Sequence, residues 1–249
     1  IKQMKFNNET LRAAVKEWLD DTACAEANYG HISSWDTSGV SDMSQLFKDA
    51  KSFNQAICDW DVSNVINMHA MFDNAYAFNQ PLNNWDVSKV TDMSEMFSSM
   101  DTLAFNQPIG NWDVSNVADM SYMFYNATVF NQPIGNWDVS NVADMSYMFY
   151  NATVFNQPIG NWDVSNVTNM ISMFANTDAF NQPIENWDLS KVTNMHGMFI
   201  HAKAFSTEDA KKIKKERSPK KGNQNQFKLV NKTLYYNGNI KTEYEVNPQ

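Results

Sequence analysis

Positive charge is scarce over much of this sequence. Lys, Arg and His are absent from Val90 to Ile184, and residues 1–210 hold 9 Lys and Arg against 25 Asp and Glu. A face that binds nucleic acid needs clustered cations to neutralise phosphates, so we expect no nucleic acid partner for the main body of the chain. No run of about 18 apolar residues is present either, which excludes a transmembrane segment.

The cations that the chain does have are concentrated near its end. Residues 211–221 (KKIKKERSPKK) carry seven basic residues and one acidic residue. A block of this kind is most often a solvated tail, although it could also touch phosphate or an acidic membrane surface. From Lys211–Lys221 we therefore expect at most a weak contact with an acidic surface.

Cysteine and glycine are also rare, with two Cys and eight Gly in the chain. Cys24 and Cys58 leave two possibilities open, a bridge from the N-terminal segment to an early repeat or a pair of free thiols. The HExxH, CxxC, GxGxxG, P-loop and GxSxG motifs are absent, and the four His are scattered. We therefore expect no catalytic site, no metal and no cofactor.

One repeated pattern dominates the sequence. Trp-Asp recurs every 25 residues, with a single spacing of 27, and residues 106–130 and 131–155 are identical. The two extra residues lie between Phe97 and Phe105, which marks a loop. A fixed period of this size is typical of stacked repeats that bury their apolar faces against one another. The seven Trp are Trp35, Trp60, Trp85, Trp112, Trp137, Trp162 and Trp187.

Each copy predicts a short strand followed by a short helix. Trp137 and Val139 alternate with Asp138, as in a strand with one buried face, and Ser140 suits the N-cap of a following helix. The helical stripe would consist of Val142, Met145, Met148, Phe149 and Ala152. Stacked copies over residues 31–205 therefore predict an α/β fold. We expect a leucine-rich-repeat-like, right-handed solenoid with a parallel sheet on one face and helices on the other.

The ends of such a stack need covers. Residues 9–28 carry an apolar stripe at helical spacing, which predicts a helical N-terminal cap within residues 1–30. Ser206-Thr-Glu-Asp209 predicts a capping box that opens a helix in residues 206–226. Asn237-Gly238 predicts a hairpin turn, and the run LYYNGNIKTEYE is similar to a MORN-like hairpin. Residues 227–249 are therefore expected to form a hairpin appendage.

The repeat motif also points to a family. It reads W-D-V-S-x-V-x-D-M, followed by M-F-x-x-A and F-N-Q-P, over roughly residues 31–205. This motif resembles the BspA-type leucine-rich-repeat surface proteins in their 25-residue form. The resemblance implies a non-enzymatic surface or interaction role, on a cell, in secreted form or on a virion. The first copy departs from the motif at Thr37 and Leu46, and the last at Ser206, which fits terminal repeats.

The Asp after each Trp is the sharpest candidate for a binding residue. If the Trp points inward, these carboxylates form an outer row, in which neighbours about 5 Å apart repel by roughly 0.8 kcal/mol in water. Either each Asp accepts hydrogen bonds from backbone, Asn or Ser groups, or the row faces a basic ligand or a cation such as calcium. One carboxylate per copy makes tight metal binding doubtful. The row is Asp36, Asp61, Asp86, Asp113, Asp138, Asp163 and Asp188.

Four tyrosines lie on the outer side of the two identical copies, Tyr122 and Tyr125 in one and Tyr147 and Tyr150 in the other. Exposed Tyr is common at protein interfaces, and singly exposed aromatics are equally ordinary. We take Tyr122 and Tyr147, with the Asp row, as candidate contacts for a protein partner in recognition or adhesion. The alternative is a structural part of a virion shell or surface layer, whose termini make the contacts.

Overall fold

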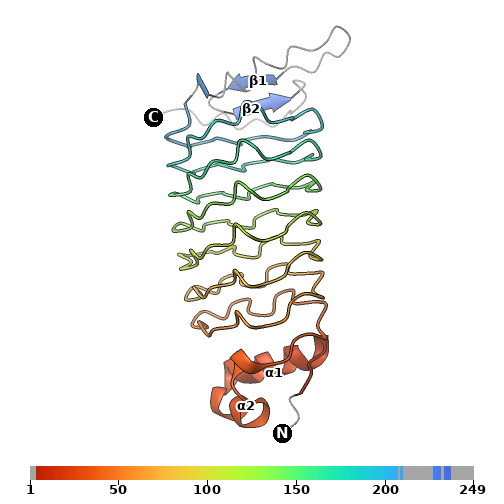
Figure 1. Ribbon diagram of the computed structural model, residues 1–249. Coiled ribbons are helices and arrows are strands. Elements are labelled where there is room, and N and C mark those ends of the chain that lie inside the picture. The colour runs from red at the N-terminus through yellow and green to blue at the C-terminus, as the bar shows by residue number, and fades with distance from the viewer. Residues whose placement is uncertain (1–3, 207, 210–226, 231–232, 237–249) are drawn as a thin grey trace.

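The computed structural model describes residues 4–206, 208–209, 227–230 and 233–236. In chain order it contains α1 (Asn8–Asp20), α2 (Thr22–Tyr29), the short 3-10 helix η1 (Ile32–Ser34), β1 (Phe227–Val230) and β2 (Thr233–Tyr236). Between the helices and the strands the chain forms a stack of coils, with α1 and α2 at one end and β1 and β2 at the other (Figure 1). Coils 1 to 7 begin at Trp35, Trp60, Trp85, Trp112, Trp137, Trp162 and Trp187.

Two helices lie at the N-terminal end of the stack. Helix α1 begins with a capping box, in which Asn7 and Thr10 bond each other's backbone N–H groups. Its buried face contacts coil 1, where the rings of Trp18 and Trp35 meet edge-on with centroids 5.8 Å apart. Asp21 has a non-helical backbone (φ −148°, ψ 89°) and caps α2. The single helix predicted over residues 9–28 is therefore two helices.

The repeats contain neither the predicted parallel sheet nor the predicted short helices. Among the described residues, consecutive coils share a single parallel β-bridge, seven residues after the Trp, and no strand lies between residues 35 and 205. Tight turns replace the expected strand: the Trp137 N–H donates to the Ile134 carbonyl (3.2 Å) and the Val142 N–H to the Val139 carbonyl (2.9 Å). The prediction of an α/β, leucine-rich-repeat-like solenoid is thus wrong.

The physical reason lies in how the backbone N–H groups are shared. In coil 4, the N–H groups of Met120, Tyr122, Phe124 and Asn126 donate to carbonyls of coil 5 at 2.8–3.0 Å. The N–H groups between them, on Met123, Tyr125 and Ala127, donate to carbonyls three residues earlier in their own coil at 3.1–3.2 Å. An α-helix would use every N–H within its own segment, so this alternation replaces a helix by a run of turns.

Residues with positive φ enforce this run of turns. They lie ten and fourteen positions after the Trp in every coil except coil 3, which has only the first of them. In coil 4 they are Tyr122 (φ 57°) and Asn126 (φ 56°), and in coil 7 Gly197 (φ 64°) takes the first position. A left-handed residue cannot continue a right-handed helix. Buried residues still recur at helical spacing, which is why the apolar pattern resembles that of a helix.

Ladders of equivalent side chains fill the stack. The Phe twelve positions after each Trp stack on one another, with ring centroids 5.6–5.8 Å apart. From coil 2 onwards each Trp donates its indole N–H to the carbonyl of the residue three positions before the preceding Trp, as Trp137 does to Ile109 at 3.0 Å. On another edge, the Asn131 side chain accepts from the Asn156 N–H (3.0 Å) and from Gln157 (3.1 Å). Each ladder therefore joins one coil to the next.

At the other end of the stack, β1 and β2 pair antiparallel, with Val230 opposite Thr233. Residues 231–232 connect these two strands, so this hairpin is a different one from that predicted at Asn237-Gly238. Ser206 and Asp209 make the side chain to backbone bonds of a capping box, at 3.2 Å and 3.0 Å. The helix predicted beyond them, including Lys211–Lys221, lies outside the described residues, as does Asn237-Gly238.

Candidate functional site

The Asp after each Trp lies on the outside of the stack and is held by a local turn. In coil 4 the Oδ1 atom of Asp113 accepts from the N–H (3.0 Å) and the hydroxyl (2.6 Å) of Ser115. Ser is therefore a donor in an Asx turn and not the predicted helix N-cap. The N–H bond recurs in all seven coils, at Asp36, Asp61, Asp86, Asp113, Asp138, Asp163 and Asp188. These contacts are the ones expected under the first alternative, in which each Asp accepts hydrogen bonds from backbone or Ser groups.

These hydrogen bonds also outweigh the repulsion along the row. The Ser140 hydroxyl, followed by the Ser140 N–H, lowers the pKa of Asp138, while the neighbouring Asp163 acts in the opposite direction and more weakly. The pKa values of Asp36, Asp86 and Asp163 are lowered in the same way. These four carboxylates therefore remain charged at neutral pH without any added cation.

Groups suited to bind a metal do not converge in the described part of the chain. No cluster of three or more His, Cys, Asp or Glu side chains that could hold an ion occurs there. Cys24 is exposed and Cys58 half-buried, and both are free thiols, so they do not form a bridge. His69 is within hydrogen-bond distance of Ser94 in the next coil, at 2.8 Å. These side chains therefore bond within the stack.

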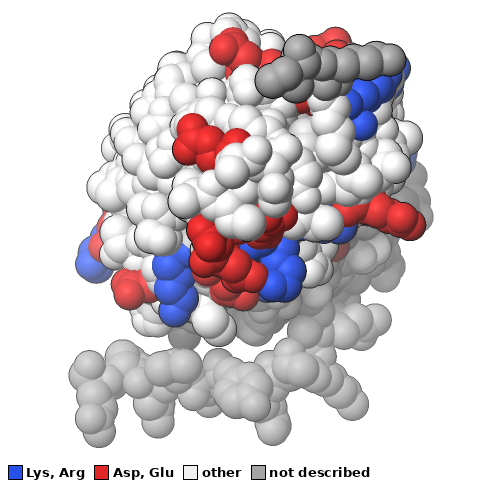
Figure 2. Space-filling model, turned by 90° about the horizontal axis from the view of Figure 1, so that it is seen from below, with Lys and Arg blue, Asp and Glu red and all other residues white. Residues whose placement is uncertain are grey.

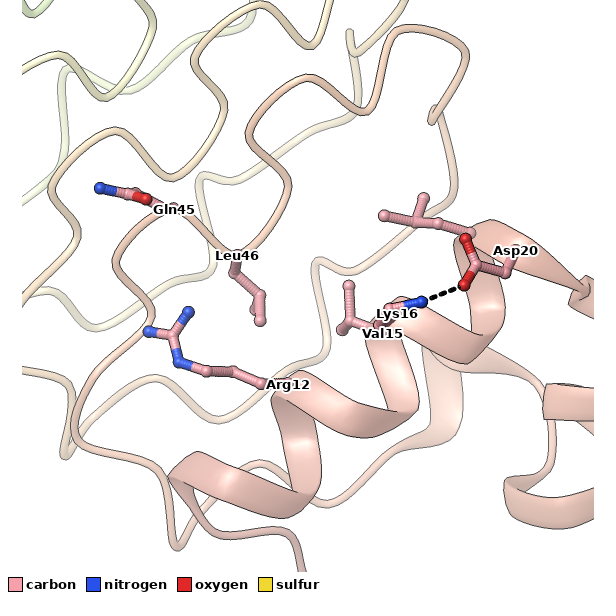
Figure 3. Close-up of a pocket in the computed structure, with 7 residues that line it drawn as sticks. Arg12, Val15, Lys16, Asp20, Gln45 and Leu46 are labelled. Atoms are coloured by element: carbon pink, nitrogen blue, oxygen red, sulfur yellow. Dashed lines mark hydrogen bonds and ion pairs between the residues drawn. The ribbon is translucent and has the colours of Figure 1, made fainter.

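A shallow pocket lies where α1 meets coil 1 (Figure 3). Its cations already have partners: Arg12 donates to Asp42 (3.2 Å) and to the Ser44 carbonyl (2.6 Å), and Lys16 pairs with Asp20. Figure 2 looks onto this end of the stack and shows basic and acidic side chains close together. The pocket is therefore a junction between cap and stack whose charged groups are already paired.

The tyrosines of coils 4 and 5 form one cluster, which we call the tyrosine patch (Tyr122, Tyr125, Tyr147 and Tyr150). Tyr122 stacks on Tyr147 and Tyr125 on Tyr150, with centroids 4.6 Å and 4.8 Å apart and rings tilted by 15° and 8°. Within one coil the rings are 5.6 Å or 5.9 Å apart. All four are half-buried, and they project from turns and not from the predicted helices. The structure thus brings together residues that the sequence presented as two separate pairs.

The tyrosine patch has a polar outer side in an acidic neighbourhood. No described residue forms a hydrogen bond with any of the four phenol hydroxyls, which leaves them available to a partner. Partial burial, followed by the neighbouring phenols, raises the pKa of Tyr122 and Tyr125, and Glu95 and Asp144 add to the effect at Tyr122. Tyr122 and Tyr125 are therefore neutral at physiological pH, and two carboxylates lie close to Tyr122.

Sequence reasoning missed Glu95 and a second row of polar residues, seven positions after each Trp. This row is bridged from coil to coil and consists of Asp42, Asn67, Asp92, Asp119, Asp144, Asn169 and Asn194. The D-M pair of the motif was the available signal, but it falls within the helix that the apolar stripe predicts. Exposed apolar residues were missed as well: Val129 (38% exposed) and Val154 (43%) follow the tyrosines in coils 4 and 5, and Met100 (85%) lies in the predicted loop of coil 3.

These observations define a repeat protein, built from stacked coils whose equivalent residues form continuous rows. Two overlapping segments, residues 14–133 and 98–213, match the family described as "Mycoplasma protein of unknown function, DUF285". The chain belongs to this family, because the matched segments cover more than half of its length. No curated protein and no solved structure matches the chain. In the described part of the chain, neither helix has the length and hydrophobicity needed to span a membrane.

Proposed function

We propose that this chain is a non-catalytic binding module of a surface protein, in the 25-residue BspA-like form, and that it recognises a protein partner through the tyrosine patch. The observation that carries the proposal is the pair of stacked tyrosine columns, whose hydroxyls have no partner among the described residues. Tyr combines a large apolar ring with a polar tip and loses little conformational entropy on binding, which suits it to interfaces. The family match supports the repeat class and leaves the partner open.

The stack supports binding more than catalysis. An active site needs several different groups that converge on one point, whereas equivalent coils present the same side chain at every step. The Asp row illustrates this, because each of its carboxylates is bound to the Ser two residues later. Ladders through the core hold the coils together, so the tyrosines are ordered before a partner arrives, which lowers the entropic cost of binding.

Site-specific cross-linking tests the proposal. A photoreactive benzoylphenylalanine replaces Val129, close to the tyrosine patch in sequence, or Ile66, a residue of coil 2 that is similarly exposed at 49%. The modified chains are added to the surface proteins of the source cells, and cross-linked bands are identified by mass spectrometry. We expect a defined partner at Val129, absent at Ile66 and lost when Tyr122 and Tyr147 are changed to Ser. Equal labelling from both positions would contradict the proposal.

Surface location is tested separately. An antibody against residues 31–205 should label intact cells that express the chain, and protease treatment of those cells should remove the label. The rival function is a structural part of a shell or surface layer, with contacts made by the termini. Deletion of residues 207–249 would abolish assembly under that alternative and would leave cross-linking at Val129 unchanged under ours.

A further inference from the structure

The chemistry of the partner follows from the groups around the tyrosine patch, and this inference rests on the proposed function. Three carboxylates of the bridged row lie in coils 3, 4 and 5, on Asp92, Asp119 and Asp144. Parallel β-bridges join Asp92 to Asp119 and Asp119 to Asp144. Glu95 takes the position in coil 3 that Tyr122 takes in coil 4. Two of these four carboxylates, on Glu95 and Asp144, lie close enough to Tyr122 to act on its pKa.

No ion pair of the described residues includes these carboxylates, although Glu95 lies close enough to Lys48, the partner of Asp73, to raise the pKa of that lysine. The ion pairs of the described residues join Arg12 to Asp42, Lys16 to Asp20, Lys48 to Asp73 and Lys203 to Asp178. None of them includes a carboxylate beside the patch, and no Lys, Arg or His occurs from Val90 to Ile184. Adjacent bridged residues lie about 5 Å apart, where two carboxylates repel each other. A cationic partner would relieve that repulsion.

The carboxylates also retain capacity for new bonds. Oδ1 of Asp92 and Oδ1 of Asp119 each accept from the Ser two residues later, at 2.5–2.9 Å. No described residue bonds the second oxygen, Oδ2, of Asp92 or Asp119. Asp144 differs, because its Oδ2 accepts from Asn169 at 3.1 Å. Two carboxylate oxygens of the bridged row in coils 3 and 4 therefore remain available to an incoming donor.

The aromatic part of the surface suits the same kind of ligand. Lysine and arginine side chains bind tyrosine rings, with the charge over the ring face. The chain already contains one contact of this type, in which the Lys51 ammonium lies 5.7 Å from the Tyr76 ring centroid. In coil 6 the positions equivalent to Tyr147 and Tyr150 are held by the small residues Ser172 and Ala175, so the tyrosine columns end there. Within the described stack, the stacked tyrosine columns are therefore confined to coils 4 and 5.

We propose that the tyrosine patch, with Glu95, Asp92 and Asp119, binds an extended segment of a protein partner that carries lysine or arginine side chains. The cationic groups bond the carboxylates. The aliphatic parts of the Lys and Arg side chains and the planar guanidinium groups of Arg pack on the tyrosine rings. In an extended segment, residues i and i+2 point the same way and lie about 7 Å apart, so two cations reach different coils at once. Charge complementarity selects this occupant over a polyanion, which the carboxylates repel.

A matched pair of peptides tests the proposal on the full chain. The first is a fluorescein-labelled peptide of alternating Arg and Gly, and the second carries citrulline, the uncharged isostere of arginine, in place of Arg. Binding is measured by fluorescence anisotropy. We expect the citrulline peptide to bind at least about tenfold more weakly, because it loses both the charge-assisted bonds and the cation–π contact. Equal binding of the two peptides would overturn the proposal.

Two single-charge variants separate the patch from general attraction to an acidic protein. Glu95→Gln removes a carboxylate beside the tyrosines, and Asp113→Asn removes an exposed carboxylate of coil 4 in the other row. We expect Glu95→Gln to weaken binding of the arginine peptide about fivefold and Asp113→Asn less than about twofold. Equal effects would mean that net charge alone attracts the peptide, which would refute the proposal. Neither substitution changes a tyrosine, so the comparison remains valid even where the obvious patch variant, Tyr122→Leu, fails to fold.

The outcomes also distinguish this inference from the proposed function. If cross-linking at Val129 finds a partner but the arginine and citrulline peptides bind alike, the binding role stands and the cationic chemistry is wrong. If the arginine peptide binds through Glu95 but no partner is cross-linked at Val129, the cationic chemistry stands and the proposed function fails.

Discussion

The indole ladder gives the sharpest test of what holds the coils together. The Trp137→Phe substitution removes the bond from the indole N–H to the Ile109 carbonyl, which is 3.0 Å long. Ile109 is fully buried, and after the substitution its carbonyl keeps only the Trp112 N–H as a donor (3.1 Å), because water cannot reach it to replace the indole. Loss of one of the two hydrogen bonds costs about 1 kcal/mol, and the lost ring atoms add about 1 kcal/mol. We therefore expect Trp137→Phe to lower the free energy of unfolding by about 2 kcal/mol.

Trp35→Phe is the matched control. Trp35 is as buried as Trp137, at 3% exposure, but its indole donates to the carbonyl of Gly30, an exposed residue at the end of α2. Water can bond that carbonyl after the substitution, so the loss should be smaller by about 1 kcal/mol. Urea unfolding followed by the fluorescence of the remaining tryptophans measures both variants.

A third variant removes the remaining ambiguity, because Trp35 lies in a terminal coil, which could fray. Trp187 also lies in a terminal coil, but its indole donates to the carbonyl of Ile159, a fully buried residue. If burial of the acceptor decides the cost, Trp187→Phe behaves like Trp137→Phe. If it behaves like Trp35→Phe, or if all three variants lose the same stability, the reasoning is refuted.

Further predictions concern the backbone and the Asp row. Gly197→Ala should lower the melting temperature and the free energy of unfolding, the latter by about 1 kcal/mol, because Gly197 has φ 64°. The converse change, Gln45→Gly at an exposed residue with φ 57°, should raise the melting temperature. A lower melting temperature in Gln45→Gly would count against the prediction. Gly135→Ala should cost about 1–3 kcal/mol in urea unfolding, because its Cβ would lie 2.4 Å from the Pro158 carbonyl oxygen. Glu185→Ala, at the equivalent position of coil 6, is its control and should change stability by less than about 0.5 kcal/mol. Since the folded pKa values of four row carboxylates lie below their ordinary value, the stability that they contribute is present above that value and is lost as pH falls below about 4. The four carboxylates are those of Asp36, Asp86, Asp138 and Asp163. When all four are changed to Asn, the melting temperature should fall less between neutral and acidic pH than it does in the unchanged protein. The same pH profile in both proteins would argue against this role.

The sequence predicted the stacking and much of the core, because period and burial depend only on which residues are apolar. The stripe Val142, Met145, Met148, Phe149 and Ala152 is fully buried, as expected. Its secondary structure could not be read from the same pattern. A helix would bury the same residues as this run of turns, which has positive φ at two positions. The two structures differ in the acceptors of the backbone N–H groups, because in the run of turns every second N–H donates to the next coil. That choice depends on the neighbouring coil, which no single copy contains.

A signal for the turns was nevertheless present. The position fourteen residues after the Trp is Asn in coils 2, 4, 5 and 6, and the position ten residues after it is Gly in coil 7. Asn and Gly are the residues that most readily adopt positive φ. In the candidate site, the Asp and Tyr positions were visible, but Glu95 was not. Its relevance comes from its equivalence to Tyr122 in the next coil, and a glutamate at one copy of a variable position carries no pattern of its own.

The identical segments 106–130 and 131–155 bear on how this surface can change over generations. A single copy supplies only one Tyr122–Tyr125 pair, and the stacked columns exist because the copy stands next to its duplicate. Exact tandem duplicates are prone to unequal recombination, which adds or removes whole copies. Since the bonds between coils recur with the same offset from one copy to the next, such an event keeps the ladders in register. The area of the tyrosine patch can thus grow or shrink in units of one coil, without any point mutation.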